Sequence, residues 1–196
     1  MGSDSDMRAG NVHPTEPHHC VTTQDNVGRR VPASHDLEYP EVPFPPRHLL
    51  DELGAPAMRR LVQRQHALLR GSSIGHLLPA DKDHYAMVVR KIENYVIESC
   101  GGPADYTQEQ RAVCIRTQHF GLTIDESGRD IWLDCLWQAL EESGMLAAQR
   151  EVFWNWLEPM SIRMINRRTT KAQPRRYPFA WVETRTKLPA LTMCRH

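Results

Sequence analysis

The sequence predicts an all-α domain between two arms that lack helical patterning. From residue 46 to residue 168, large apolar side chains recur at intervals of three and four, the spacing of one helix face. No run in this region alternates apolar and polar residues beside a hairpin dipeptide, so strands are not indicated. Prolines gather on the N-terminal side, where seven of the fourteen precede residue 47.

These patterns divide the chain into three parts. Residues 1–46 form a proline-rich arm, expected to be disordered or extended, because the stretch YPEVPFPP cannot supply continuous backbone donors. Residues 47–168 form one helical domain, for whose core the 40% apolar content of the chain suffices. Residues 169–196 form a C-terminal extension with three prolines and no helical period.

Glycines and aspartates set the expected limits of the first three helices. A short helix at RHLLDELG stops at Gly54, and a second helix ends at Gly71. Asp81 or Asp83 can cap the third helix. That helix must end at Gly101-Gly102-Pro103.

The second half of the domain begins with an irregular stretch. Residues 103–124 show only a possible helical turn from Cys114 to His119. Thr123 and Glu126 have the spacing of a capping box, which predicts the start of a helix that runs to Gly144. A last helix is expected over residues 146–168.

The bulk composition points to a cytoplasmic protein without a charged partner. Lysine plus arginine and aspartate plus glutamate both count 24, so no net field favours nucleic acid. The five cysteines are scattered without a C-x-x-C pair and are interpreted as reduced thiols. No apolar run is long enough for a membrane span, and the first residues lack the pattern of a secretory signal. The basic run RRTTKAQPRR is expected to be a solvated tail, with an acidic partner as the alternative.

Four segments together resemble truncated haemoglobins of the second group. They are LLDELG, CGGPADYTQEQR, RTQHF and RDIWLDCLWQAL, and they follow one another at the separations usual for that family. The resemblance covers residues 49–166 and leaves both tails outside. It implies a two-over-two helical sandwich around a b-type haem.

The resemblance also implies two residues of the haem site. His119 matches the histidine that ligates the iron, and Trp132 matches the pocket tryptophan whose indole N–H can donate to a bound ligand. The alternative is that His119 is a satisfied polar side chain in a helical core and Trp132 is core packing.

The distal side departs from the family. Where the family has Arg-Phe-Tyr, this chain has Arg64-Gln65-His66, so His66 takes the place of a ligand-binding tyrosine. Leu78 stands where a tyrosine or phenylalanine is usual. His66 and Trp132 would therefore be the residues that make polar contacts to a ligand on the distal side.

Three roles for His66 remain open from the sequence. It can donate a hydrogen bond to a bound diatomic ligand, act as acid and base toward peroxide, or close the iron as a sixth ligand. It can also merely fill space between helices. Because the segment 79–87 differs in length from the family pattern, His76 or His84 could take the distal place instead.

The remaining pocket contacts are expectations of the same kind. Val88 and Ile92 are expected on the ligand side of the third helix, Phe120 and Ile124 on the proximal wall, Tyr95 pointing into the pocket, and Arg116 near the haem propionates.

The expected function is binding or redox conversion of dioxygen, nitric oxide or peroxide, with an electron donor as partner. One alternative is a haem-dependent peroxidase or oxidase acting on an organic substrate. Another is a haem-based sensor or interaction domain. The chain is expected to be a monomer or homodimer that binds neither nucleic acid nor membrane.

Overall fold

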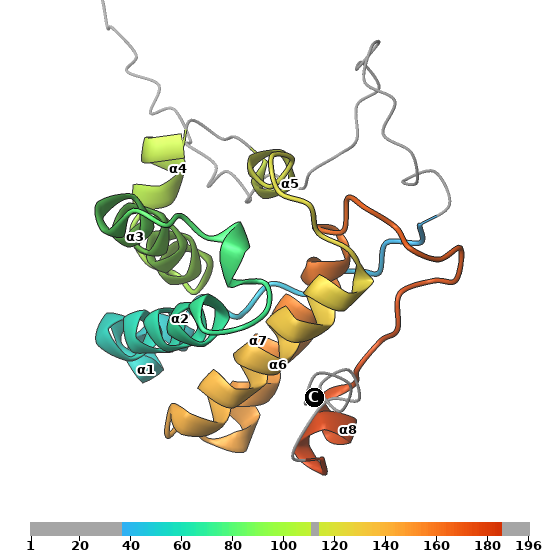
Figure 1. The fold of residues 1–196 in the computed structure, drawn as a ribbon. Coiled ribbons are helices and arrows are strands. Elements are labelled where there is room, and N and C mark those ends of the chain that lie inside the picture. Colours follow the sequence, from blue (N-terminus) through green and yellow to red (C-terminus); the bar gives the residue numbers. More distant parts are fainter. Residues whose placement is uncertain (1–36, 111–113, 186–196) are drawn as a thin grey trace, which may run out of the picture.

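The computed structural model describes residues 37–110 and 114–185, and every regular element in these ranges is a helix (Figure 1). The elements are α1 (Leu49–Leu53), α2 (Ala55–Arg70), the 3-10 helix η1 (Gly75–Leu77), α3 (Lys82–Ser99), α4 (Asp105–Gln110), α5 (Ile115–Gln118), α6 (Glu126–Glu142), α7 (Ala147–Ile162) and α8 (Phe179–Glu183). The all-α prediction is confirmed.

Four long helices form two packed pairs. Helix α2 packs on α3, α6 packs on α7, and α2 also crosses α6 (Figure 1). The short helices α4 and α5 lie on the path that leads from α3 to α6. This arrangement confirms the expected two-over-two sandwich.

The core lies where α7 meets the other long helices. Phe153, Trp154 and Trp156 of α7 are fully buried, as are Leu136 and Leu140 of α6. Burial of these large side chains supplies most of the stabilisation expected from the hydrophobic effect.

Capping explains two of the helix starts. Asp81 caps α3, with its side chain accepting from the backbone N–H of His84 at 2.8 Å. The predicted capping box at Thr123 is wrong, because α6 is capped by Asp125, which accepts from Gly128 N–H at 2.7 Å. The Glu126 carboxylate, which the capping box would have directed to the backbone N–H of Thr123, instead accepts from the backbone N–H and the hydroxyl of Thr169.

Two helices differ from the sequence-based limits. Helix α4 was expected to be irregular, because DYTQEQ has no apolar stripe. Its Tyr106 ring packs edge-on against Tyr95 of α3 at 5.1 Å, and tertiary contact therefore supports this helix. Helix α7 ends at Ile162 rather than at residue 168.

The last ten residues of the expected N-terminal arm lie on the domain. Leu37 and Pro45 are buried, and the Phe44 ring lies 6.0 Å from that of Trp156. The Arg163 guanidinium donates to the Pro40 carbonyl at 3.0 Å. The arm up to residue 36 lies outside the described residues.

The expected C-terminal extension completes the core. Tyr177, Phe179 and Val182 are buried, and the Trp154 indole N–H donates to the Tyr177 carbonyl at 2.6 Å. The folded unit therefore extends past residue 168 to α8. Residues 186–196 lie outside the described part of the chain.

Two further expectations concern the thiols and membranes. Cys100 and Cys135 are free thiols, but Cys114 belongs to a disulfide, so the expectation of five reduced cysteines is wrong for that residue. Among the described helices, none combines the length and apolar character needed to cross a bilayer.

Candidate functional site

His119 directly follows the four-residue helix α5, as its C-cap. Its Nδ1 lies 2.7 Å from the Ile115 carbonyl oxygen. Because a carbonyl only accepts, Nδ1 carries the proton and the lone pair of the neutral ring is on Nε2. The described residues offer no hydrogen-bond partner to that Nε2, which leaves it available as a ligand atom.

His66 has the same arrangement on α2. It is buried, and its Nδ1 lies 2.8 Å from the Val62 carbonyl oxygen, so Nδ1 again donates and Nε2 holds the lone pair. Burial lowers the pKa of His66, while the Val62 carbonyl and the charge of Glu93 oppose that shift. The ring is therefore neutral near pH 7.

The two histidines lie within electrostatic range of each other. A positive charge on His119 further lowers the pKa of His66. The chain positions that carry them are 53 residues apart, His66 on α2 and His119 at the end of α5. That His66 and His119 belong to one site stays a prediction.

An apolar cluster adjoins the end of α2. Trp132 and Leu78 pack with Leu68, Leu69, Ile74, Ile131 and Cys135. Trp132 also contacts the main core, together with Ile92 and Tyr95. Two of the expected pocket residues, Trp132 and Leu78, are therefore brought together.

Apolar side chains on α3 and after α5 remain accessible. Phe120, next to His119, is 42% exposed, and Met87 of α3 is 39% exposed. Val88 and Ile92 of α3 are only partly buried.

Tyr95 is tied to the core of the domain. Its ring lies 5.7 Å from that of Trp156, and its hydroxyl donates to Met160 Sδ at 3.4 Å. These contacts join α3 to α7. They do not place the hydroxyl beside either histidine.

Arg116, expected near haem propionates, lies over aromatic rings. Its guanidinium is 5.4 Å from the Tyr39 ring centre and 5.9 Å from that of Phe120. Arg163 lies on Tyr39 as well, at 5.3 Å. Tyr39 of the N-terminal segment thus connects the proximal helix α5 to the end of α7.

Glu93 is a buried charge that sequence reasoning missed. Its carboxylate accepts from Arg59 at 2.9 Å and from Gln63 at 2.8 Å, both on α2. The signal was present, since Glu93 has helical spacing with the apolar Val89 and Val96 and so lies on the buried face of α3. Its charge acts on His66, as the pKa shift above shows.

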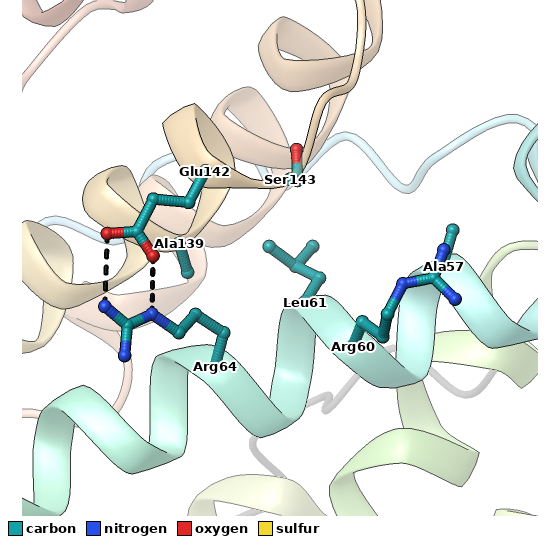
Figure 2. Close-up of a pocket in the computed structure, with 7 residues that line it drawn as sticks. All are labelled: Ala57, Arg60, Leu61, Arg64, Ala139, Glu142 and Ser143. Atoms are coloured by element: carbon teal, nitrogen blue, oxygen red, sulfur yellow. Dashed lines mark hydrogen bonds and ion pairs between the residues drawn. The ribbon is translucent and has the colours of Figure 1, made fainter.

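A surface hollow of about 190 Å³ lies between α2 and α6 (Figure 2). It is lined by Ala57, Arg60, Leu61, Arg64, Ala139, Glu142 and Ser143. Arg64 forms a two-pronged ion pair with Glu142 at 2.5 and 3.1 Å, which joins the two helices at one side of the hollow (Figure 2). None of the expected site residues lines it.

Two packed helix pairs, with a histidine on a short helix between α3 and α6, define a truncated globin. The sequence model of the bacterial-like globins matches residues 48–166. The chain belongs to this family.

The proteins similar to this chain include truncated haemoglobins of the second group. It is 29% identical to the group 2 truncated hemoglobin YjbI of Bacillus subtilis (strain 168) over 99 residues, which cover 50% of this chain and 71% of that protein. The structure of phosphate-bound Hell's gate globin IV is 40% identical, with a TM-score of 0.72, over 76% of this chain and 92% of that chain. The group II 2-on-2 hemoglobin of Agrobacterium tumefaciens is 27% identical, with a TM-score of 0.55, over 60% and 93%.

Family membership implies haem binding and a small gaseous ligand, and the residues present fit a haem. The imidazoles of His66 and His119 each donate from Nδ1 to a backbone carbonyl, and each has an Nε2 without a partner among the described residues. Phe120, which follows His119 in the chain, is a partly exposed apolar side chain. A haem needs a ligand atom for its iron and apolar contacts for its ring.

Proposed function

We propose that His119 holds the iron of a b-type haem and that His66 lies on the opposite, ligand-binding side. The observation that carries the proposal is the shared arrangement of the two imidazoles. In each, the backbone carbonyl four residues earlier fixes the proton on Nδ1, and Nε2 is left as the only lone pair.

His119 supplies what a proximal ligand requires. The hydrogen bond from its Nδ1 to Ile115 fixes the tautomer and orients the ring, as is usual for histidines that bind metals. A bound haem supplies an iron that takes small ligands such as dioxygen, nitric oxide or peroxide on its free face.

The tautomer of His66 selects among its possible roles. A neutral ring whose Nδ1–H is engaged by Val62 has no N–H left to donate from Nε2. This disfavours donation to a diatomic ligand and favours the two roles that need a lone pair, namely a sixth ligand or a base. Trp132 is then the residue that offers an N–H to the ligand.

The base role gives His66 a defined proton path. Its Nε2 can accept the first proton of peroxide and return it to the leaving oxygen, while Nδ1–H stays on the Val62 carbonyl. The charge of Glu93 stabilises the imidazolium between these two steps, because it raises the pKa of His66. This supports peroxide conversion, with oxidation of an organic substrate as the second candidate function.

Absorption spectra of the reconstituted protein test the assignment of both histidines. The unsubstituted protein is expected to show a Soret band, and His119→Ala should lose haem on gel filtration. If His66 is a sixth ligand, the ferric spectrum should change from low-spin to high-spin in His66→Ala. If it is a base, the ferric protein should stay high-spin, and peroxide-driven dye oxidation should fall by about 10²-fold or more.

His84→Ala is the matched control, because His84 is exposed on α3 and was, with His76, one of the two further distal candidates. A spectrum and a peroxide rate that respond to His84→Ala but not to His66→Ala would overturn the distal assignment. Full haem retention by His119→Ala would overturn the proximal one.

A further inference from the structure

We infer that Asn166 is a positioning residue for His119, which sets the iron–imidazole bond by holding the backbone around that histidine. The inference rests on the proposed role of His119 as the iron ligand. Asn166 lies four residues after the end of α7, in a segment that the sequence assigned only to a longer helix.

The side chain of Asn166 makes three hydrogen bonds to the loop after α5. Its Nδ2 donates to the carbonyl of His119 at 3.1 Å and to the carbonyl of Leu122 at 2.7 Å. Its Oδ1 accepts from the backbone N–H of Ile124 at 2.9 Å. One carboxamide thus holds both ends of the segment 119–124.

The backbone beside Asn166 reinforces this connection. The N–H groups of Asn166 and Arg167 both donate to the Ile124 carbonyl, each at 3.0 Å. Ile162 and Ile165 just before them are buried in the domain. The loop is therefore attached to a rigid part of the molecule.

This attachment matters because α5 alone cannot place its histidine. A single turn of four residues has little stability without tertiary contacts. His119 is the residue at its end, so the direction of the His119 carbonyl and the position of its ring depend on the loop that follows. A metal ligand must be held within about 0.5 Å of its productive position.

The chemistry of the amide is specific. Asn166 uses one acceptor and both N–H groups of its carboxamide. An aspartate has nearly the same shape but would direct carboxylate oxygens at two carbonyl oxygens. The substitution Asn166→Asp therefore keeps the bond to Ile124 and removes the two bonds on the histidine side.

The test measures the iron–imidazole stretch of the ferrous holoprotein by resonance Raman spectroscopy, together with the rate of haem transfer to apomyoglobin. Asn166→Asp is expected to shift and broaden that stretch and to release haem about tenfold faster, because it removes the two hydrogen bonds to the His119 and Leu122 carbonyls. Asn166→Ala should act in the same direction if the aspartate variant does not fold. Asn155→Asp on the exposed face of α7 is the charge-matched control and should leave both readouts unchanged.

A second set of variants distinguishes an effect on the position of His119 from a general loss of protein stability. In His119→Gly reconstituted with free imidazole, the ligand is no longer joined to the loop, so adding Asn166→Asp should leave the iron–imidazole stretch unchanged. An equal shift in that background, or no shift in the intact protein, would overturn the inference. Haem retention by His119→Gly without imidazole would instead overturn the proposed role of His119.

Discussion

At the scale of single residues, the two glycines after α3 are required both by the backbone conformation and by close packing. Gly101 has φ +108°, a conformation that residues with a side chain rarely adopt, and a Cβ there would lie 1.9 Å from the Arg47 carbonyl oxygen. At Gly102 a Cβ would lie 2.8 Å from the Ile97 carbonyl oxygen. The motif therefore ends the helix and also lets α1 approach its end.

Gly101→Ala should destabilise the protein by about 2–4 kcal/mol, since it combines a left-handed conformation with a backbone clash. Urea denaturation of the apoprotein measures this. Gly121→Ala is the control, because nothing lies within 4 Å of a Cβ at that position. Equal midpoints for the two variants would show that the close approach to Arg47 carries no energy.

The buried thiols give a second prediction at this scale. Burial raises the pKa of Cys100 to about 12, and burial together with the charge of Asp134 raises that of Cys135 to about 11. Because the thiolate is the reactive form, iodoacetamide at pH 8 should leave both unlabelled in the folded protein and label both after unfolding. Peptide mass mapping reads each site separately, and rapid labelling of Cys135 in the native state would contradict its burial beside Trp132.

At the scale of elements, a buried ion pair joins α6, α7 and the C-terminal segment. Arg129 donates to Glu158 Oε1 at 2.7 Å, to Ser161 Oγ at 2.8 Å and to the Arg175 carbonyl at 2.8 Å. The side chains of Arg129 and Glu158 are only 1% and 3% exposed. Such a pair stabilises only while both partners are present.

Arg129→Met should cost about 3–5 kcal/mol, because it leaves Glu158 buried with only the half-exposed Arg176 as its charge partner. Adding Glu158→Leu to that variant should recover much of the loss, since a well-packed apolar pair is often neutral relative to a buried ion pair. The free energies of unfolding of Arg129→Met, Glu158→Leu and the double variant, measured by urea denaturation, give the interaction energy of the pair. Additive losses would mean that the two side chains do not interact.

At the scale of the whole molecule, the segment after α7 belongs to the folded domain. The Trp137 ring meets those of Trp154 and Phe179 edge-on, at 5.6 and 5.9 Å. Tyr177 and Val182 are buried in the same core. Without this segment, Trp137 of α6 and Trp154 of α7 would be exposed to solvent on the side that Phe179 and Tyr177 now contact.

Phe179→Ala should therefore lower the free energy of unfolding by about 3–5 kcal/mol, the range for removing a buried aromatic ring. Lys171→Ala, exposed in the same segment, is the control and should change it by less than about 0.5 kcal/mol. Intrinsic tryptophan fluorescence during urea unfolding follows both variants. A Phe179→Ala protein as stable as the control would place the end of the domain near residue 168, where composition had placed it.

The sequence alone determined the long helices, because their apolar periodicity and their glycine and aspartate limits are local. It also indicated His119, His66 and Trp132, through a pattern of residue types and separations. Tertiary structure decided what has no local signal, namely the support of α4 by Tyr95 and the docking of α8, and it decided between Thr123 and Asp125 as the cap of α6. It also fixed the proton of each histidine, since only the folded backbone brings a carbonyl to Nδ1 and leaves Nε2 free.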